Sequence, residues 1–110
     1  MTTDQKDIVV ILVATSGLDE ARKIANAVLT ARYAACVTIV PSVHSMYWWE
    51  GKIAQEEESM LVVKTTGDQY GAIEKAIKEL HSYKVPEIVA VAVKDGLPQY
   101  LEWIRREVSI

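Results

Sequence analysis

The feature that most constrains the fold of this chain is a pair of extended stretches, residues 35–49 and 52–66. The turn Glu50-Gly51 joins them. The first alternates loosely between apolar and polar residues, and the second returns with polar residues first and apolar ones later. Fifteen extended residues span roughly 50 Å at about 3.3 Å each, whereas a compact domain of this length is about 35 Å across. The sequence therefore predicts a β-hairpin that extends about 15 Å beyond its own domain.

Pro41 leaves two interpretations of the first stretch open. Proline has no amide hydrogen to donate, so the stretch is either one edge or bulged strand, or two shorter strands that remove the overhang. The hairpin tip carries Tyr47, Trp48 and Trp49, and large exposed apolar area marks contact sites. We therefore expect these three residues at an oligomer interface, with the hairpin edge pairing to another copy of the chain. Ligand stacking on the tryptophans is the alternative.

Outside the hairpin the chain alternates strands and helices. Residues 7–15 and 88–93 are continuous apolar runs, typical of strands buried on both faces. Two segments between them repeat apolar residues at helical spacing, and Pro98 opens a short last helix. The order βαββαβ plus a C-terminal helix predicts an α+β, ferredoxin-like split βαβ fold, with residues 1–110 forming a single domain.

This topology leaves one face of the sheet bare, because right-handed crossovers place both long helices on the same face. The alternation of side chains along a strand does not decide whether its odd-numbered or its even-numbered residues lie on the bare face. A bare apolar face is a second argument for a partner. Candidates for it are Val9, Ile11 and Val13, with Val89, Val91 and Val93.

The composition excludes several classes of protein. A net charge of −3 provides no footprint for nucleic acid or an anionic membrane. The longest apolar run, residues 8–14, is far shorter than the ~20 residues of a membrane helix. The single cysteine, Cys36, excludes an internal disulfide, and the polar residues 1–7 lack the basic and apolar regions of a signal peptide. These features predict a cytoplasmic location.

The chain also lacks the local motifs of common enzymes. It has no Gly-rich phosphate loop, no Cys-x-x-Cys pair, no His-Glu-x-x-His helix and no nucleophile-elbow serine. No residue pattern in the chain indicates a catalysed reaction, so we expect a protein that is not an enzyme.

Two groups of residues far apart in the sequence form a joint motif. The first is Ala34-Ala35-Cys36-Val37-Thr38-Ile39-Val40 followed by Tyr47-Trp48-Trp49-Glu50-Gly51-Lys52-Ile53. The second is His81-Ser82-Tyr83-Lys84-Val85-Pro86-Glu87-Ile88 followed by Tyr100-Leu101-Glu102-Trp103-Ile104. Together they resemble the divalent-cation tolerance family CutA, and the resemblance covers residues 8 to about 103.

The resemblance implies a tight, non-enzymatic homotrimer of ferredoxin-like subunits whose long strands pair between subunits. It also implies a role in tolerance of and response to copper and other divalent cations, with copper binding proposed for some members. Family members are structurally similar to PII signalling proteins, so the alternative is a PII-like regulatory trimer that binds a small metabolite in an intersubunit cleft. A scaffolding trimer without a ligand is a third possibility.

The chain departs from the family pattern at two places. Ser82 follows His81, where family loops often read His-Pro-Tyr, and residues 13–15 lack the extra cysteine that some members carry there. A copper site that uses that cysteine cannot be built here in the same form.

Cys36 and His81 are the candidate ligands for Cu²⁺ or another divalent cation. Cys36 offers a soft thiolate, and its alternative role is a small hydrophobic residue at the start of a strand. His81 follows the end of a helix, where an imidazolium is favoured, and the family resemblance supports it as a ligand. Tyr83, Lys84 and Glu87 are expected to border the same cleft as structural loop residues.

The acidic run Glu56-Glu57-Glu58 is the remaining candidate. In a strand Glu56 and Glu58 share one face while Glu57 faces the other, so the three cannot all bind one ion without a bulge. Such a run is usually a solvated face or pairs with nearby bases. A weak divalent-cation site is the alternative, because hard ions take carboxylates.

Overall fold

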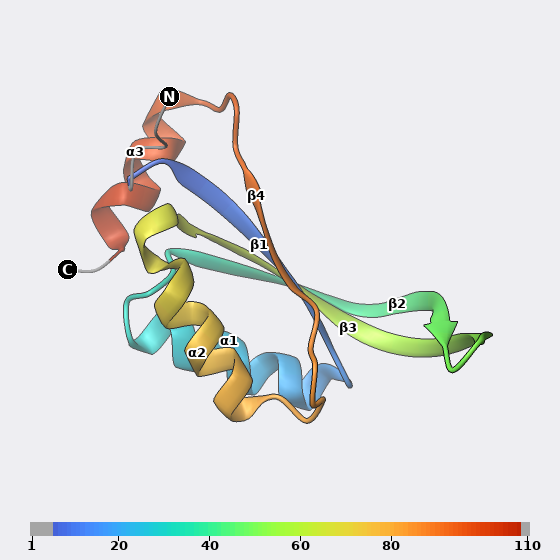
Figure 1. Cartoon of the computed structure of the whole chain (residues 1–110). Helices are drawn as coiled ribbons and strands as arrows, with labels where there is room; N and C mark the ends of the chain where they lie inside the picture. Colours follow the sequence, from blue (N-terminus) through green and yellow to red (C-terminus); the bar gives the residue numbers. More distant parts are fainter. Residues whose placement is uncertain (1–5, 109–110) are drawn as a thin grey trace.

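A four-stranded antiparallel sheet with strand order β2-β3-β1-β4 forms the centre of the structure (Figure 1). The structure is a computed structural model that describes residues 6–108, so most of the polar N-terminal segment lies outside the described residues. The predicted α+β, ferredoxin-like order with a C-terminal helix is confirmed. The elements are β1 (Ile8–Thr15), α1 (Leu18–Thr30), β2 (Cys36–Trp49), β3 (Lys52–Thr66), the 3₁₀ turn η1 (Gly67–Gln69), α2 (Tyr70–Leu80), β4 (Ile88–Ala92) and α3 (Pro98–Glu107).

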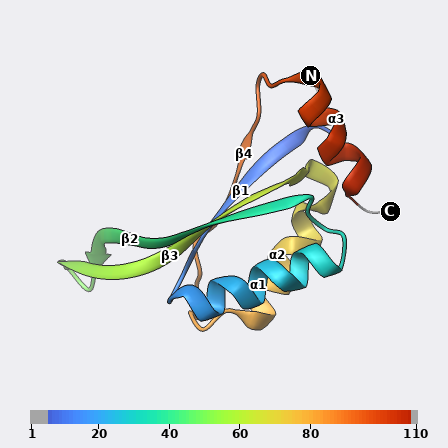
Figure 2. The ribbon, with the colours of Figure 1, turned by 180° about the vertical axis from the view of Figure 1, so that it is seen from behind.

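Helices α1 and α2 lie together on one face of the sheet, as both views of the ribbon show (Figures 1 and 2). Ile24 and Val28 of α1 and Ile73 and Ile77 of α2 are fully buried. Their spacing of four residues places each pair on one side of its helix. Each such side chain contributes roughly 1.5–3 kcal/mol on burial, so this face supplies most of the core. Within the described residues, no helix is long and apolar enough to cross a bilayer.

The alternation in β1 assigns Val9, Ile11 and Val13 to the helix-covered core. Their expected place on the bare face was therefore wrong. The period of two determines which residues share a face, but not which face the helices cover. Val10 and Leu12, which are half-buried, occupy the second face instead.

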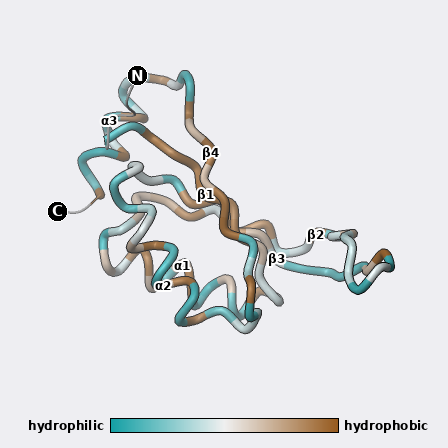
Figure 3. The backbone as a smooth tube through the Cα atoms, in the orientation of Figure 1, coloured by the Kyte–Doolittle hydropathy of each residue, from teal (hydrophilic) through white to brown (hydrophobic). Residues whose placement is uncertain are grey.

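The second face stays largely open. Val89 and Val91 pair with β1 on this side and are 47% and 51% exposed, as the sequence predicted. Figure 3 shows hydrophobic residues running along β1 and β4. Helix α3 covers one end of this face, where Ile104 packs near Ile8 and Val93.

The β2–β3 hairpin extends beyond the rest of the sheet (Figure 1). Strand β1 pairs with β3 only as far as Ser59. Beyond it, residues 52–58 of β3 pair with residues 43–49 of β2 and with no other described strand. The longest dimension of the structure is 43 Å. The predicted overhang is thus present, and we call residues 43–49 and 52–58 the outer ribbon.

A bulge in β2 marks the base of the outer ribbon. Pro41 and Ser42 together oppose the single residue Ser59, whose hydroxyl donates a hydrogen bond of 2.7 Å to the Pro41 carbonyl oxygen. Strand β2 continues through the bulge, so the interpretation as two shorter strands was wrong. The extra residue shifts the alternation by one. Beyond the bulge, odd-numbered residues of β2 share a face with even-numbered residues of β3.

Candidate functional site

A cleft of about 670 Å³ lies between the outer ribbon and the loop that follows α2. The ribbon residues that line it share the face of the sheet that α1 and α2 do not cover, as the shifted alternation requires. Tyr83, Lys84 and Glu87 border the cleft, but His81, which was expected at the same cleft, is not among its lining residues. The full lining comprises Ala14, Tyr47, Trp49, Ala54, Glu56, Glu58, Tyr83, Lys84, Val85 and Glu87.

His81 fixes the start of this loop to the end of β1. Its side chain is fully buried, with Nε2 2.7 Å from the Ala14 carbonyl oxygen and Nδ1 3.0 Å from the Tyr83 backbone nitrogen. A carbonyl only accepts and a backbone N–H only donates, so Nε2 carries the proton and Nδ1 accepts. Both ring nitrogens are therefore used within the protein, and neither is available to a metal in this conformation.

Glu20, in the first turn of α1, holds the same loop from the other side. Its carboxylate accepts hydrogen bonds from the N–H groups of Ser16 (3.0 Å) and Ser82 (2.8 Å), and lies 3.5 Å from His81 Nδ1. Partial burial alone raises the pKa of Glu20, but these hydrogen bonds outweigh it and hold the pKa below its ordinary value. Sequence reasoning missed this role, because an acid at the start of a helix is already explained by the helix dipole.

Tyr83 and Glu58 meet across the cleft. The Tyr83 ring lies 4.7 Å from the His81 ring, and its hydroxyl donates a 2.8 Å hydrogen bond to Glu58 Oε2 and lies 3.4 Å from Glu56 Oε2. Burial and these two carboxylates raise the pKa of Tyr83 well above its ordinary value. Burial and the same carboxylates also raise the pKa of Tyr47. The cleft thus has a negative electrostatic character that keeps both phenols protonated.

The acidic run is divided between the two faces of the ribbon. Glu56 and Glu58 line the cleft and Glu57 does not, as strand alternation predicts. Glu58 is only 7% exposed, whereas Glu57 is an exposed residue. The interpretation of the acidic run as a solvated face therefore holds for Glu57 but not for Glu58.

The aromatic tip is divided in the same way. Trp49 and Tyr47 line the cleft, whereas Trp48 and its cross-strand partner Ile53 project from the other face. Trp48 and Trp49 are 73% and 64% exposed. Their role at an oligomer interface stays a prediction.

Cys36 lies far from His81 in the sheet. It pairs with Lys64 of β3, with Sγ 3.9 Å from Lys64 Nζ, and Lys64 in turn pairs with Val10 of β1. His81 instead contacts Ala14, near the opposite end of β1. In the part of the chain that the structure describes, no group of three His, Cys, Asp or Glu side chains could hold a metal ion. A metal site of Cys36 and His81 is therefore not formed within one subunit, and their role as ligands stays a prediction.

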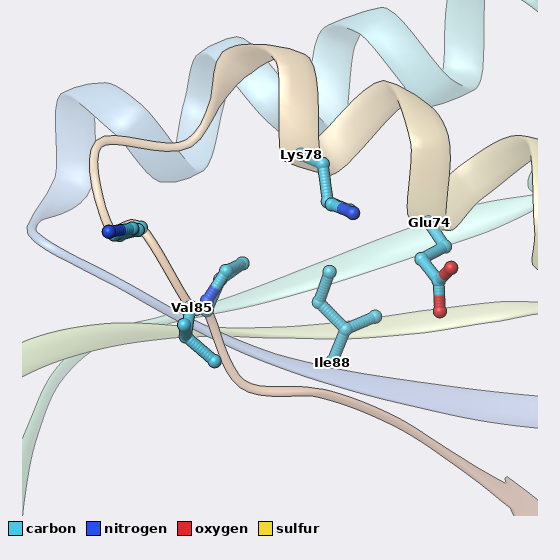
Figure 4. A pocket seen from close by; sticks show the side chains of 6 residues that line it. Glu74, Lys78, Val85 and Ile88 are labelled. Atoms are coloured by element: carbon cyan, nitrogen blue, oxygen red, sulfur yellow. The ribbon is translucent and has the colours of Figure 1, made fainter.

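A smaller pocket of about 300 Å³ lies on the other side of the loop, between α2 and β4 (Figure 4). Lys78 and Glu74 extend from α2 toward Ile88 and Val85, so this pocket combines opposite charges with an apolar wall. The Glu74 carboxylate already accepts a 2.8 Å hydrogen bond from the Tyr70 hydroxyl. Two lysines, Lys78 and Lys84, and one carboxylate, Glu74, line this pocket, whereas carboxylates outnumber the single lysine in the larger cleft.

Comparison with known proteins decides the family. The sequence model of the CutA1 divalent ion tolerance protein family matches residues 9–107. This chain belongs to the CutA family. The divalent-cation tolerance protein CutA of Thermus thermophilus is 42% identical to it over 96 residues, which cover 87% of this chain and 93% of that protein.

Solved CutA structures share the fold. The structure of the Thermus thermophilus protein has a TM-score of 0.90 at 39% identity and covers 93% of this chain and 99% of its own. The periplasmic divalent cation tolerance protein CutA from Archaeoglobus fulgidus has a TM-score of 0.89 at 35% identity, with the same coverage. The family resemblance and the ferredoxin-like fold are therefore confirmed, and divalent-cation tolerance is the family role.

The expectation of a cytoplasmic location was wrong. The Archaeoglobus CutA is described as periplasmic, and a rice CutA that is 36% identical over 97 residues is described as chloroplastic. This chain spans about half the length of the plant CutA proteins, 55% in the rice protein. A lone cysteine has no partner within the chain in any compartment, so it does not indicate a reducing one.

Proposed function

We propose that this CutA protein acts in divalent-cation tolerance as a non-enzymatic homotrimer that binds Cu²⁺ or another divalent cation between its subunits. The observation that supports the assembly best is the outer ribbon, whose two strands pair only with each other among the described residues. Unpaired strand edges normally pair with another chain or are blocked. The outer edge of β4, with the exposed Val89 and Val91, is a suitable surface to receive it.

The cation is expected to take ligands from more than one subunit, because Cys36 and His81 lie apart within one. Cys36 offers the soft sulfur that copper prefers. His81 must release the Tyr83 N–H before it binds a metal, so metal binding and the position of the loop are coupled in this proposal.

A PII-like role is the second candidate, and the larger cleft favours it. Its volume of about 670 Å³ lies in the range of small-molecule sites. The cleft is bounded by Tyr47 and Trp49, which we expect near a neighbouring subunit. A metabolite bound there would lie at a subunit boundary.

Light scattering tests the assembly. We expect about three times the 12.3 kDa subunit mass. Trp48→Ala should weaken association by roughly 2 kcal/mol or more, measured from the concentration dependence of dissociation, because buried tryptophans are common interface anchors. Arg22→Ala, at an exposed position of α1, is the control and should leave the mass unchanged. A stable monomer at all accessible concentrations refutes the trimer.

Calorimetric titration with Cu²⁺ tests the cation site. We expect binding tighter than micromolar in the wild-type protein and its loss in Cys36→Ser and His81→Ala. His44→Ala, which removes an exposed histidine from the ribbon, is the matched control and should bind as the wild type does. Circular dichroism checks that the His81 variant is folded. No heat of binding at millimolar Cu²⁺ refutes the site.

A further inference from the structure

The larger cleft contains a buried carboxylate without a cationic partner among residues 6–108. Glu58 is 7% exposed, and its one hydrogen bond from the described residues comes from the neutral Tyr83 hydroxyl. No described ion pair includes Glu58, although Lys84 lines the same cleft. A buried carboxylate is costly unless a positive charge compensates it. A cation that enters the cleft would supply this compensating charge.

The walls of the cleft are suited to a particular kind of cation. Tyr47, Trp49 and Tyr83 present aromatic rings, and their π faces attract cations. Glu56 adds a second carboxylate on the same face of the ribbon as Glu58. A lining that combines carboxylate acceptors with aromatic rings can bind a group that is both charged and partly apolar.

A divalent metal ion matches this environment poorly. Ca²⁺ takes six to eight oxygen ligands, and Mg²⁺ requires octahedral oxygen coordination and gives up its water reluctantly. The described side chains form no metal-holding group here, and much of the lining is aromatic or aliphatic. An organic ammonium ion is more weakly hydrated and needs only two or three acceptors.

We infer that this cleft binds a small organic ammonium ion, a protonated amine whose N–H groups donate to Glu58 and Glu56 and whose carbon skeleton lies against Tyr47, Trp49 and Tyr83. The inference rests on the metabolite-binding candidate above and names its ligand class. The cleft volume of about 670 Å³ accommodates a molecule larger than a simple alkylamine.

Calorimetric titration of the full chain with phenethylammonium at neutral pH tests the inference. We expect saturable binding and much weaker binding of 2-phenylethanol, a neutral molecule of the same shape. Glu58→Gln should weaken binding by about tenfold, because one charge-assisted hydrogen bond is lost. Glu57→Gln makes the same change of charge on the opposite face of the strand and should leave the affinity unchanged.

The two neighbouring tryptophans provide a second matched pair. Trp49→Ala should weaken phenethylammonium binding because Trp49 lines the cleft, whereas Trp48→Ala, titrated at a protein concentration at which the trimer stays intact, should not. Light scattering on each variant separates loss of the site from loss of assembly: Glu58→Gln is expected to keep the wild-type mass. Equal weakening by Glu57→Gln and Glu58→Gln, equal binding of phenylethanol, or no saturable binding at millimolar phenethylammonium overturns the inference.

Discussion

The two halves of the β2–β3 hairpin have the same backbone hydrogen-bond pattern but opposite surroundings. In the inner half, Leu61 and Val63 are fully buried under α1 and α2. In the outer ribbon, Trp48 and Ile53 form a cross-strand pair that is mostly exposed. The boundary is Ser59, where β1 ends and the bulge interrupts β2.

This contrast separates the source of stability from the location of the site. The inner half is stabilised by apolar burial on one face, as an ordinary α+β core is. The outer ribbon buries little by itself, and two-stranded ribbons are marginally stable in water. Its residues are instead arranged to contact something else, with Glu58 and Trp49 on one face and Trp48 on the other.

The largest expected effect is the loss of stability caused by a substitution in the core beneath the inner half. Ile73→Ala should lower the free energy of unfolding by about 2–5 kcal/mol, because a fully buried side chain leaves a cavity. Ile53→Ala makes the same chemical change in the outer ribbon and should cost much less within the subunit, with any loss depending on protein concentration. Urea denaturation at several protein concentrations measures both. Equal losses that do not depend on concentration contradict the comparison.

The backbone plan was accessible from the sequence because it follows from local patterns. Residues 52–66 were predicted as one strand and form β3 with those bounds. The helical spacing of apolar residues predicted two helices, which form α1 and α2, and it did not predict the turn η1 that precedes α2. The division of the acidic run between two faces also followed from the period of two.

What the sequence could not provide are choices that depend on contacts between distant segments. The alternation in β1 is compatible with either face until the helices are placed, so Val9, Ile11 and Val13 were assigned to the wrong one. The contacts of Glu20 with Ser82 and of His81 with Ala14 join segments 62 and 67 residues apart. No local pattern marks such pairs, so the anchoring of the loop could not be predicted.

A second prediction concerns the loop that closes the cleft. Glu20→Gln should lower the free energy of unfolding by about 1–3 kcal/mol near neutral pH, because hydrogen bonds to a charged acceptor are weakened. The folded-state pKa of Glu20 is lowered, so its contribution is present above the ordinary pKa and is lost as the pH falls through the folded value. Urea denaturation as a function of pH should therefore show the two proteins converging in acid.

Asp19→Asn is the control for this prediction. It removes the same charge from the same helix turn at an exposed position. It therefore reproduces the loss of any favourable interaction between that charge and the helix dipole. A loss of stability as large as that of Glu20→Gln would show that the helix terminus, rather than the hydrogen bonds to the loop, accounts for the effect.

The smallest predicted effect sharpens the comparison at the cleft itself. Tyr83→Phe removes the hydroxyl that donates to Glu58 and should cost about 1 kcal/mol at neutral pH. The folded-state pKa of Tyr83 is raised, so the phenol's contribution is complete below its ordinary value of about 10 and is lost as the pH rises above it. The difference in free energy of unfolding between the wild type and Tyr83→Phe should therefore shrink in alkaline solution. The same difference for Tyr100→Phe, which changes an exposed tyrosine, serves as the reference. A wild-type advantage that stays constant into strong alkali would mean that the hydroxyl does not sense the carboxylates, and the negative character of the cleft would lose its main support.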